Sequence, residues 1–187
     1  MAPTPSMRFY LTTRDPYDTN YCTEEGQVIY KAVSPYKLIN RKASIYKIVP
    51  SDPNDMRDQF EAIAEIEYHD VSSTMITWGG ERKSSRSMFR KGGIGWLGSD
   101  RIFTGPDGKE YCWKLANTKP VLYTNDKTET HVAKFNQAAL INLSNKLEGK
   151  ANLEIYPAGE HMVDLIVVTL CYIEKLRRDR ERSAASS

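Results

Sequence analysis

The sequence predicts a mainly β fold, an antiparallel barrel or sandwich, that encloses one hydrophobic helix near the end of the chain. Two observations carry this prediction. Short segments rich in β-branched and aromatic residues alternate with turn residues from about residue 8 to residue 156. A nearly continuous apolar run from Met162 to Ile173 then follows, interrupted only by Asp164 and Thr169. At 187 residues the chain is long enough for one domain with a substantial core.

The first half of the chain contains five strand candidates, each bounded by proline, glycine or polar turn residues. They are residues 8–11, 27–33, 44–49, 60–68 and 74–78. In the fourth, apolar residues at the even positions from 60 to 68 alternate with charges at 61, 65 and 67. This pattern fits a period of 2 better than one of 3.6, so we expect a strand rather than a helix there. The turn-rich segment 13–18 is expected to be a loop.

The second half of the chain continues the pattern of short strands. A short strand is expected at residues 88–89, and longer ones at residues 101–104, 109–115, 120–124, 131–135 and 151–156. The clearest hairpin joins the first two of these longer strands, because Asp107-Gly108 supplies the positive φ that a tight turn needs. Residues 138–147 give no clear pattern.

The apolar run near the end is expected to be a helix over residues 160–177. An unbroken run of about 12 to 18 residues is long for a strand, and Glu160 at its start and Arg177 and Arg178 near its end complement the helix dipole. The apolar length is far below the roughly 20 residues that span a bilayer, so enclosure by protein is favoured over insertion into lipid, and no transmembrane span is expected. Residues 1–6 and 179–187 are expected to be flexible tails around one domain, 7–178.

One stripe of the predicted helix is polar. On a helical wheel, Asp164, Cys171 and Lys175 share a narrow face. Because a carboxylate inside a buried segment is costly without a partner, this face should lie against a barrel opening or a hydrogen-bonding partner. Cys22, Cys112 and Cys171 are far apart in the sequence, so we expect free thiols.

Charged residues are segregated in the first half of the chain, although the net charge is only +2. Residues 31–47 contain five cations and no acid, residues 52–70 contain seven acids and one arginine, and residues 81–91 are again basic. Such blocks form either a basic face for an anionic partner or solvated strand faces whose charges pair with each other. The sequence leaves both interpretations open.

Five segments carry a resemblance to a known family. They are Ile63-Ala64-Glu65-Ile66-Glu67-Tyr68, Arg101-Ile102-Phe103, Gly108-Lys109-Glu110-Tyr111-Cys112-Trp113-Lys114, Val132-Ala133-Lys134-Phe135 and Asp164-Leu165-Ile166-Val167-Val168-Thr169. A β-rich chain that ends in such a helix resembles the tubby C-terminal-like superfamily. Within it, the sequence is similar to an uncharacterised domain family of mushroom-forming fungi. The resemblance implies an antiparallel barrel of about 12 strands around a central C-terminal helix.

The resemblance suggests a function only by analogy. The superfamily includes phosphoinositide-binding tubby domains and phospholipid scramblases, but none of the tubby lipid-contact positions can be matched here residue by residue, so no residue role is transferred. The residues themselves provide no metal-ligand spacing around His69, His131 or His161 and no nucleophile elbow, so no cofactor, metal site or enzyme activity is expected. A pI of about 8.3 is low for a nucleic-acid-binding domain.

We therefore expect a non-enzymatic binding module that meets an anionic phospholipid or phosphoinositide at a membrane surface. The basic side chains expected to make this contact are Lys37, Arg41, Lys42, Arg82, Lys83, Arg86, Arg90 and Lys91. Trp96 and Leu97 would enter the interface beside them. The alternative is a protein-interaction or scaffold barrel with no lipid ligand. The sequence shows no secretory signal, which favours a cytoplasmic protein that is peripheral to membranes under the first hypothesis.

Overall fold

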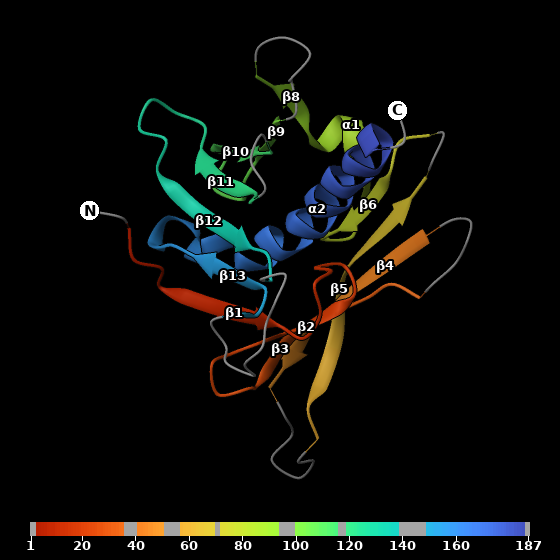
Figure 1. Ribbon diagram of the computed structural model, residues 1–187, viewed down its shortest axis with the longest axis vertical. Helices are drawn as coiled ribbons and strands as arrows, with labels where there is room; N and C mark the ends of the chain where they lie inside the picture. The colour runs from red at the N-terminus through yellow and green to blue at the C-terminus, as the bar shows by residue number, and fades with distance from the viewer. Residues whose placement is uncertain are drawn as a thin grey trace.

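A computed structural model describes residues 3–35, 41–50, 57–69, 72–93, 100–115, 119–138 and 149–185. These residues include a sheet of 13 strands and a long C-terminal helix (Figure 1). Strands lie on both sides of the helix, so the sheet curves around it. The mainly β class with a C-terminal helix is therefore confirmed.

The strands are short and follow one another closely along the chain. They are β1 (Met7–Leu11), β2 (Thr19–Cys22), β3 (Val28–Val33), β4 (Arg41–Val49), β5 (Gln59–Tyr68), β6 (Met75–Trp78), β7 (Glu81–Ser84), β8 (Arg90–Gly92), β9 (Asp100–Thr104), β10 (Glu110–Lys114), β11 (Val121–Thr124), β12 (His131–Asn136) and β13 (Asn152–Ile155). The helical elements are α1 (Ser85–Met88), the 3₁₀ helix η3 (Pro157–Met162) and α2 (Val163–Ala185).

The sheet order is β7-β6-β5-β4-β3-β2-β1-β13-β12-β11-β10-β9-β8, and every neighbouring pair is antiparallel. Strands that are consecutive in sequence pair with each other, except for β7 and β8, and one long-range ladder joins β1 to β13. That ladder joins the first strand to the last one at the centre of the sheet. The chain then enters η3 and α2, which places the helix inside the curve.

The sheet does not close into the barrel that the resemblance implies. β7 and β8 stand at the two ends of the order, and no ladder joins them in the described ranges. The segment between them forms the short helix α1. At its end, the amide of Phe89 donates a hydrogen bond to the carbonyl of Ser85 at 3.0 Å. These two strands therefore do not form a hairpin, and the sheet stays open there.

All strand predictions longer than two residues are confirmed, with ends shifted by a few residues. The strand predicted at residues 88–89 is wrong, because Met88 ends α1, and the Ser84 hydroxyl caps that helix by accepting from the amide of Ser87 at 3.1 Å. β2, β7 and β8 escaped prediction because each has only three or four residues in polar sequence. The unassigned segment 138–147 lies almost wholly outside the described residues.

The helix α2 begins at Val163, because residues 160–162 of the predicted helix belong to the 3₁₀ helix η3, and it ends at Ala185, eight residues beyond the predicted end at 177. Residues 179–185, which the sequence analysis placed in a C-terminal tail, are therefore part of this helix. Charged pairs one turn apart explain the extension, because they stabilise a helix without apolar contacts. The pairs are Lys175 with Asp179, Arg177 with Glu181, and Glu174 with both Arg177 and Arg178.

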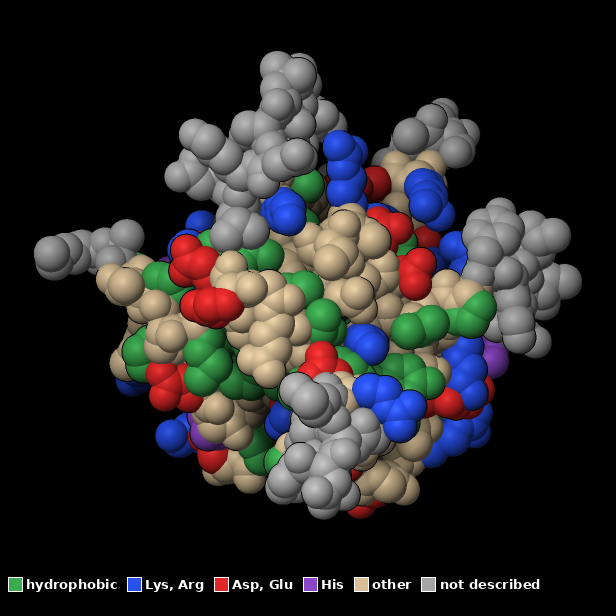
Figure 2. Space-filling model, turned by 90° about the horizontal axis from the view of Figure 1, so that it is seen from below, with side chains coloured by type: hydrophobic (Ala, Val, Ile, Leu, Met, Phe, Trp, Pro, Cys, Tyr) green, Lys and Arg blue, Asp and Glu red, His purple; other side chains and the backbone are tan. Residues whose placement is uncertain are grey.

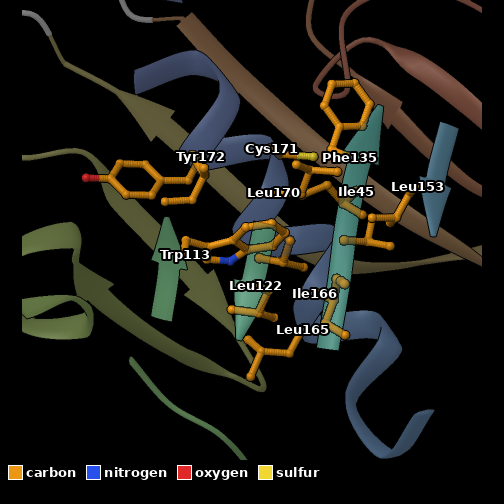
Figure 3. Packing of buried hydrophobic residues seen from close by; sticks show 14 of the residues in the cluster. Ile45, Trp113, Leu122, Phe135, Leu153, Leu165, Ile166, Leu170, Cys171 and Tyr172 are labelled. Atoms are coloured by element: carbon orange, nitrogen blue, oxygen red, sulfur yellow. The ribbon is translucent and has the colours of Figure 1, made fainter. Parts of the chain in front are cut away.

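The core lies between α2 and the inner face of the sheet (Figure 3). Ile166, Val167 and Leu170 of the helix are fully buried, as is Trp113 of β10. The one polar residue of the helix centre is satisfied, since the Thr169 hydroxyl accepts a hydrogen bond from the indole Nε1 of Trp113 at 3.0 Å. The apolar run is thus the central packing element. No described helix is long and apolar enough to cross a membrane.

Candidate functional site

Seven of the eight basic side chains predicted to bind lipid lie in the described part of the chain; Lys37 lies outside it, as do Trp96 and Leu97. The structure divides the seven into two groups. One group is neutralised by nearby acids along the strands. The other group lies beside Lys175 near the C-terminal end of α2.

Four of the seven form ion pairs with carboxylates on the same strand or on a strand one or two places away. The pairs are Lys42 with Glu65, Arg82 with Glu67, Lys83 with Glu81, and Arg90 with Glu110. Arg90 makes a two-pronged contact, with Nε–Oε1 at 3.0 Å and Nη2–Oε2 at 2.6 Å. On the face shown in Figure 2, positive and negative side chains are interspersed in the same way. The charge of these four residues is therefore balanced locally.

Arg86 and Lys91 have a different environment. Both line a cavity of about 270 Å³ between α1, β8 and α2, elements that also lie side by side in Figure 1. The cavity is lined by two further cations, Arg101 of β9 and Lys175 of α2. We call the cavity defined by these four residues the basic pocket. Asp179 is its one described carboxylate, so positive charge is in excess.

The two cations that sequence reasoning missed are the buried ones. Arg101 is 5% exposed and Lys175 is 7% exposed, whereas Arg86 and Lys91 are exposed at the rim. Arg101 donates through Nη1 to the carbonyl of Asp100 at 3.0 Å. The ammonium of Lys175 pairs with Asp179 and lies 5.5 Å from the centre of the Tyr68 ring. Placing Lys175 on the polar stripe of α2 was the one sequence signal that pointed to this cluster.

One cation of the basic pocket, Arg101, also affects a neighbouring arginine. Burial lowers the pKa of the Arg180 guanidinium below its ordinary value, and the positive charge of Arg101 lowers it further.

Beside the imidazole of His69, the remaining polar wall of the basic pocket is made of hydroxyl groups. They belong to Ser72, Ser73, Thr74 and Ser85. Hydroxyls and guanidinium or ammonium groups together form the donor set that binds phosphate oxygens. The wall contains no second carboxylate in the described residues that would hold a metal ion, and no group of three potential metal ligands occurs in the described ranges.

Arg41, the seventh predicted cation, lies on the other side of Lys175. It lines an adjoining cavity of about 350 Å³ that shares Tyr68 and Lys175 with the basic pocket. Asp15 and Asp18 also line this second cavity, so its charge is mixed. The structure therefore brings Arg41, Arg86 and Lys91 to one end of the helix, with Lys175 between them.

The polar stripe of α2 has partners along its whole length, as the sequence predicts. Asp164 accepts hydrogen bonds from the Tyr30 hydroxyl and from Lys47 Nζ, the latter at 2.8 Å. The Cys171 thiol donates to the carbonyl of Pro16 at 3.2 Å. Burial raises the pKa of this thiol to about 12, so it is not a reactive thiolate near neutral pH. All three cysteines are free, which confirms that expectation.

The fold and the basic pocket define a class of protein: a single antiparallel sheet curved around a C-terminal helix, with a cation-lined cavity at one end of that helix. Within this class, residues 14–179 match the model of a family of unknown function, DUF6593. The chain belongs to this family, which confirms the expectation of an uncharacterised domain. No curated protein and no solved structure matches the sequence.

Proposed function

We propose that this protein is a non-enzymatic binding module that takes the phosphate group of an anionic membrane lipid, such as a phosphoinositide, into the basic pocket. The excess of cations around this cavity carries the proposal. Four of them face it against one carboxylate, and two of the four are buried. A buried cation interacts more strongly with an anion than an exposed one, because less water screens it.

The size of the basic pocket suits one phosphate group rather than a whole drug-sized molecule. Its volume of about 270 Å³ is just below the range of about 300–1,000 Å³ that is typical of small-molecule sites. The exposed Arg86 and Lys91 would then meet neighbouring headgroups, and each such cation contributes about 1 kcal/mol near an anionic surface. The protein would accordingly be cytoplasmic and peripheral to the membrane.

The fold is consistent with the tubby C-terminal-like superfamily, and we infer that the chain is a fungal member of it. The antiparallel sheet around a buried C-terminal helix supports this assignment. The function proposed here rests on the pocket rather than on that relationship, because a shared fold does not establish a shared ligand.

Liposome co-sedimentation tests the proposal with a matched pair of variants from one segment. Arg86→Ala with Lys91→Ala removes two cations of the basic pocket, whereas Arg82→Ala with Arg90→Ala removes two that are ion-paired with acids. We expect the first pair to lower retention on phosphoinositide liposomes at low salt by about tenfold, and the second pair to change it little. Equal loss in both variants would contradict the assignment to this pocket.

Two further arms of the experiment identify the source of the phosphate. Liposomes with phosphatidylserine alone test general attraction to negative charge, and soluble inositol phosphate or inorganic phosphate tests binding without a membrane. Binding of the soluble phosphates that is sensitive to Arg86→Ala would indicate a free phosphate ligand. No retention on any anionic liposome at low salt would rule out the lipid.

A protein-interaction or scaffold module with no lipid ligand is the second candidate function. The observation that favours it is the local neutralisation of Lys42, Arg82, Lys83 and Arg90, which leaves no continuous basic surface among these four. Under this function the protein would stay in the supernatant with every liposome.

A further inference from the structure

A large cavity lies at the opposite end of α2 from the basic pocket. It has a volume of about 790 Å³ and is lined by Leu165, near the start of the helix. Leu165 and Lys175 are ten residues apart in α2, about 15 Å along the axis, so the two cavities are separate. A volume of this size falls within the range of about 300–1,000 Å³ that holds small organic ligands.

The floor of this cavity is apolar. Phe9 of β1, Met162 of η3 and Leu165 of α2 are buried there, and Ile29 of β3 is half-buried. The open side of the sheet adds a half-buried Trp78 of β6. Such a floor favours binding of the apolar part of a ligand, since each methylene group that it buries lowers the free energy of binding and the hydrophobic effect does not depend on direction.

Aromatic rings in the wall provide a place for a positive charge. Phe9 and Tyr30 form an edge-to-face pair with ring centres 5.7 Å apart, and Trp78 contributes a third ring to the wall. The ammonium of Lys47 already lies 6.0 Å from the centre of the Tyr30 ring. The cavity thus contains a cation–π contact made by its own side chain, which is the contact that an organic cation would make with the other rings.

The charge of the wall is negative. Its carboxylates are Glu24, Glu25, Glu160 and Asp164, against the two cations Arg8 and Lys47. Both cations are occupied, since Arg8 pairs with Glu154 and Lys47 with Asp164, each at 2.8 Å. No ion pair in the described part of the chain involves Glu24, Glu25 or Glu160. These three exposed carboxylates leave the mouth of the cavity electronegative.

We propose that this cavity is a second ligand site, and that it binds a hydrophobic organic cation: an amine or quaternary ammonium attached to an apolar chain or ring. The apolar floor takes the body of the ligand. The aromatic rings and the carboxylates of the mouth take its charge. A phosphate-bearing ligand is repelled here, so the two ends of α2 select ligands of opposite charge.

Three probes with one apolar body test the charge preference. They are 4-phenylbutyl-trimethylammonium, 4-phenylbutanol and 4-phenylbutanoate, each titrated into the full chain carrying ¹³C-methyl methionine. Met7 and Met162 line the cavity and report binding, whereas Met75 of β6 does not line it and serves as the internal control.

We expect the methyl signals of Met7 and Met162 to shift with the cation at concentrations about tenfold lower than with the alcohol or the carboxylate. Glu24→Gln with Glu160→Gln should remove this preference while leaving the affinity for the alcohol unchanged. Both residues are exposed, so the variant should fold. Asp58→Asn, an exposed acid outside the cavity, is the matched control and should keep the preference.

Two results would overturn the proposal. One is the absence of any shift of Met7 and Met162 at millimolar concentrations of all three probes. The other is equal or tighter binding of 4-phenylbutanoate. Filling the cavity with Ile29→Trp should abolish the shifts caused by the cation, and persistent shifts in that variant would place the binding elsewhere.

Discussion

The two ends of α2 differ in size, polarity and sign of charge, although they belong to one helix. The N-terminal end opens into a large cavity with an apolar floor and a negative mouth, whereas the C-terminal end borders a small polar pocket with excess cations. Between them, residues 165–173 are buried. The comparison teaches that enclosing the middle of a helix leaves its two ends as the places where polar chemistry can meet a ligand.

The largest expected effect compares the buried middle of α2 with its N-terminal end. Val167→Asp places an unpaired charge at a fully buried position, so we expect the variant not to fold cooperatively. Val163→Asp, only half-buried at the cavity, is the control and should stay folded. Urea denaturation followed by circular dichroism distinguishes the two. A cooperative transition of wild-type midpoint in Val167→Asp would show that the middle of α2 is not enclosed.

The next effect concerns the buried ion pairs near the C-terminal end. Glu174 is fully buried and pairs with Arg177 at 2.7 Å and with Arg178 at 3.1 Å. Glu174→Ala removes the buried carboxylate that the two arginines share and leaves them only their more exposed partners, Glu181 and Asp15, so we expect the free energy of unfolding to fall by about 3–5 kcal/mol. Glu181→Ala removes an exposed partner of Arg177 and should cost less than about 1 kcal/mol. Similar losses in both variants would argue against a special role of burial.

Alkaline pH should lower the free energy of unfolding through Cys171, which lies in the buried middle of α2. Because burial raises the pKa of its thiol from 9.0 to about 12, the unfolded chain releases this proton at a lower pH than the folded protein does. The stabilisation is therefore complete below pH 9 and is lost as the pH rises towards 12. Between pH 9 and pH 11 we expect this one thiol to remove about 2–3 kcal/mol. Chemical denaturation at pH 9 and pH 11 measures this loss. In Cys171→Ala the free energy of unfolding should fall between these two pH values by that much less than in the wild type, and an equal fall in both proteins would contradict the prediction.

The smallest effect on stability is also the sharpest test of the comparison. Lys175→Met replaces a buried ammonium by an apolar chain of similar length, and its partner Asp179 is half-exposed, so the free energy of unfolding should change by less than about 1 kcal/mol. Retention on phosphoinositide liposomes should nevertheless fall, while binding of 4-phenylbutyl-trimethylammonium at the other end should not change, because sites more than about 10 Å apart act independently. A change at both ends would show that they are coupled.

Sequence reasoning succeeded where the pattern is local. The alternation in β5 and the Asp107-Gly108 turn each predict their element from neighbouring residues alone, and the structure confirms them. It failed where elements are too short to carry a period, as in α1 and β8. For the site, the sequence predicted Arg86 and Lys91 among the lipid-binding cations. It did not predict that these two differ from Arg82 and Arg90, which are ion-paired with acids. That distinction depends on which strand lies opposite each side chain.

By itself, the sequence determined the mainly β class, most of the strands and the enclosure of the run from Met162 to Ile173, because hydrophobic periodicity and turn chemistry act over a few residues. Only the tertiary structure decided which charges lie beside acids on neighbouring strands and which gather around one cavity. The ladder between β1 and β13 and the curvature of the sheet bring Arg101 and Lys175 together across 74 residues of sequence. Charges interact through space, so their partners follow from the fold and not from their order along the chain.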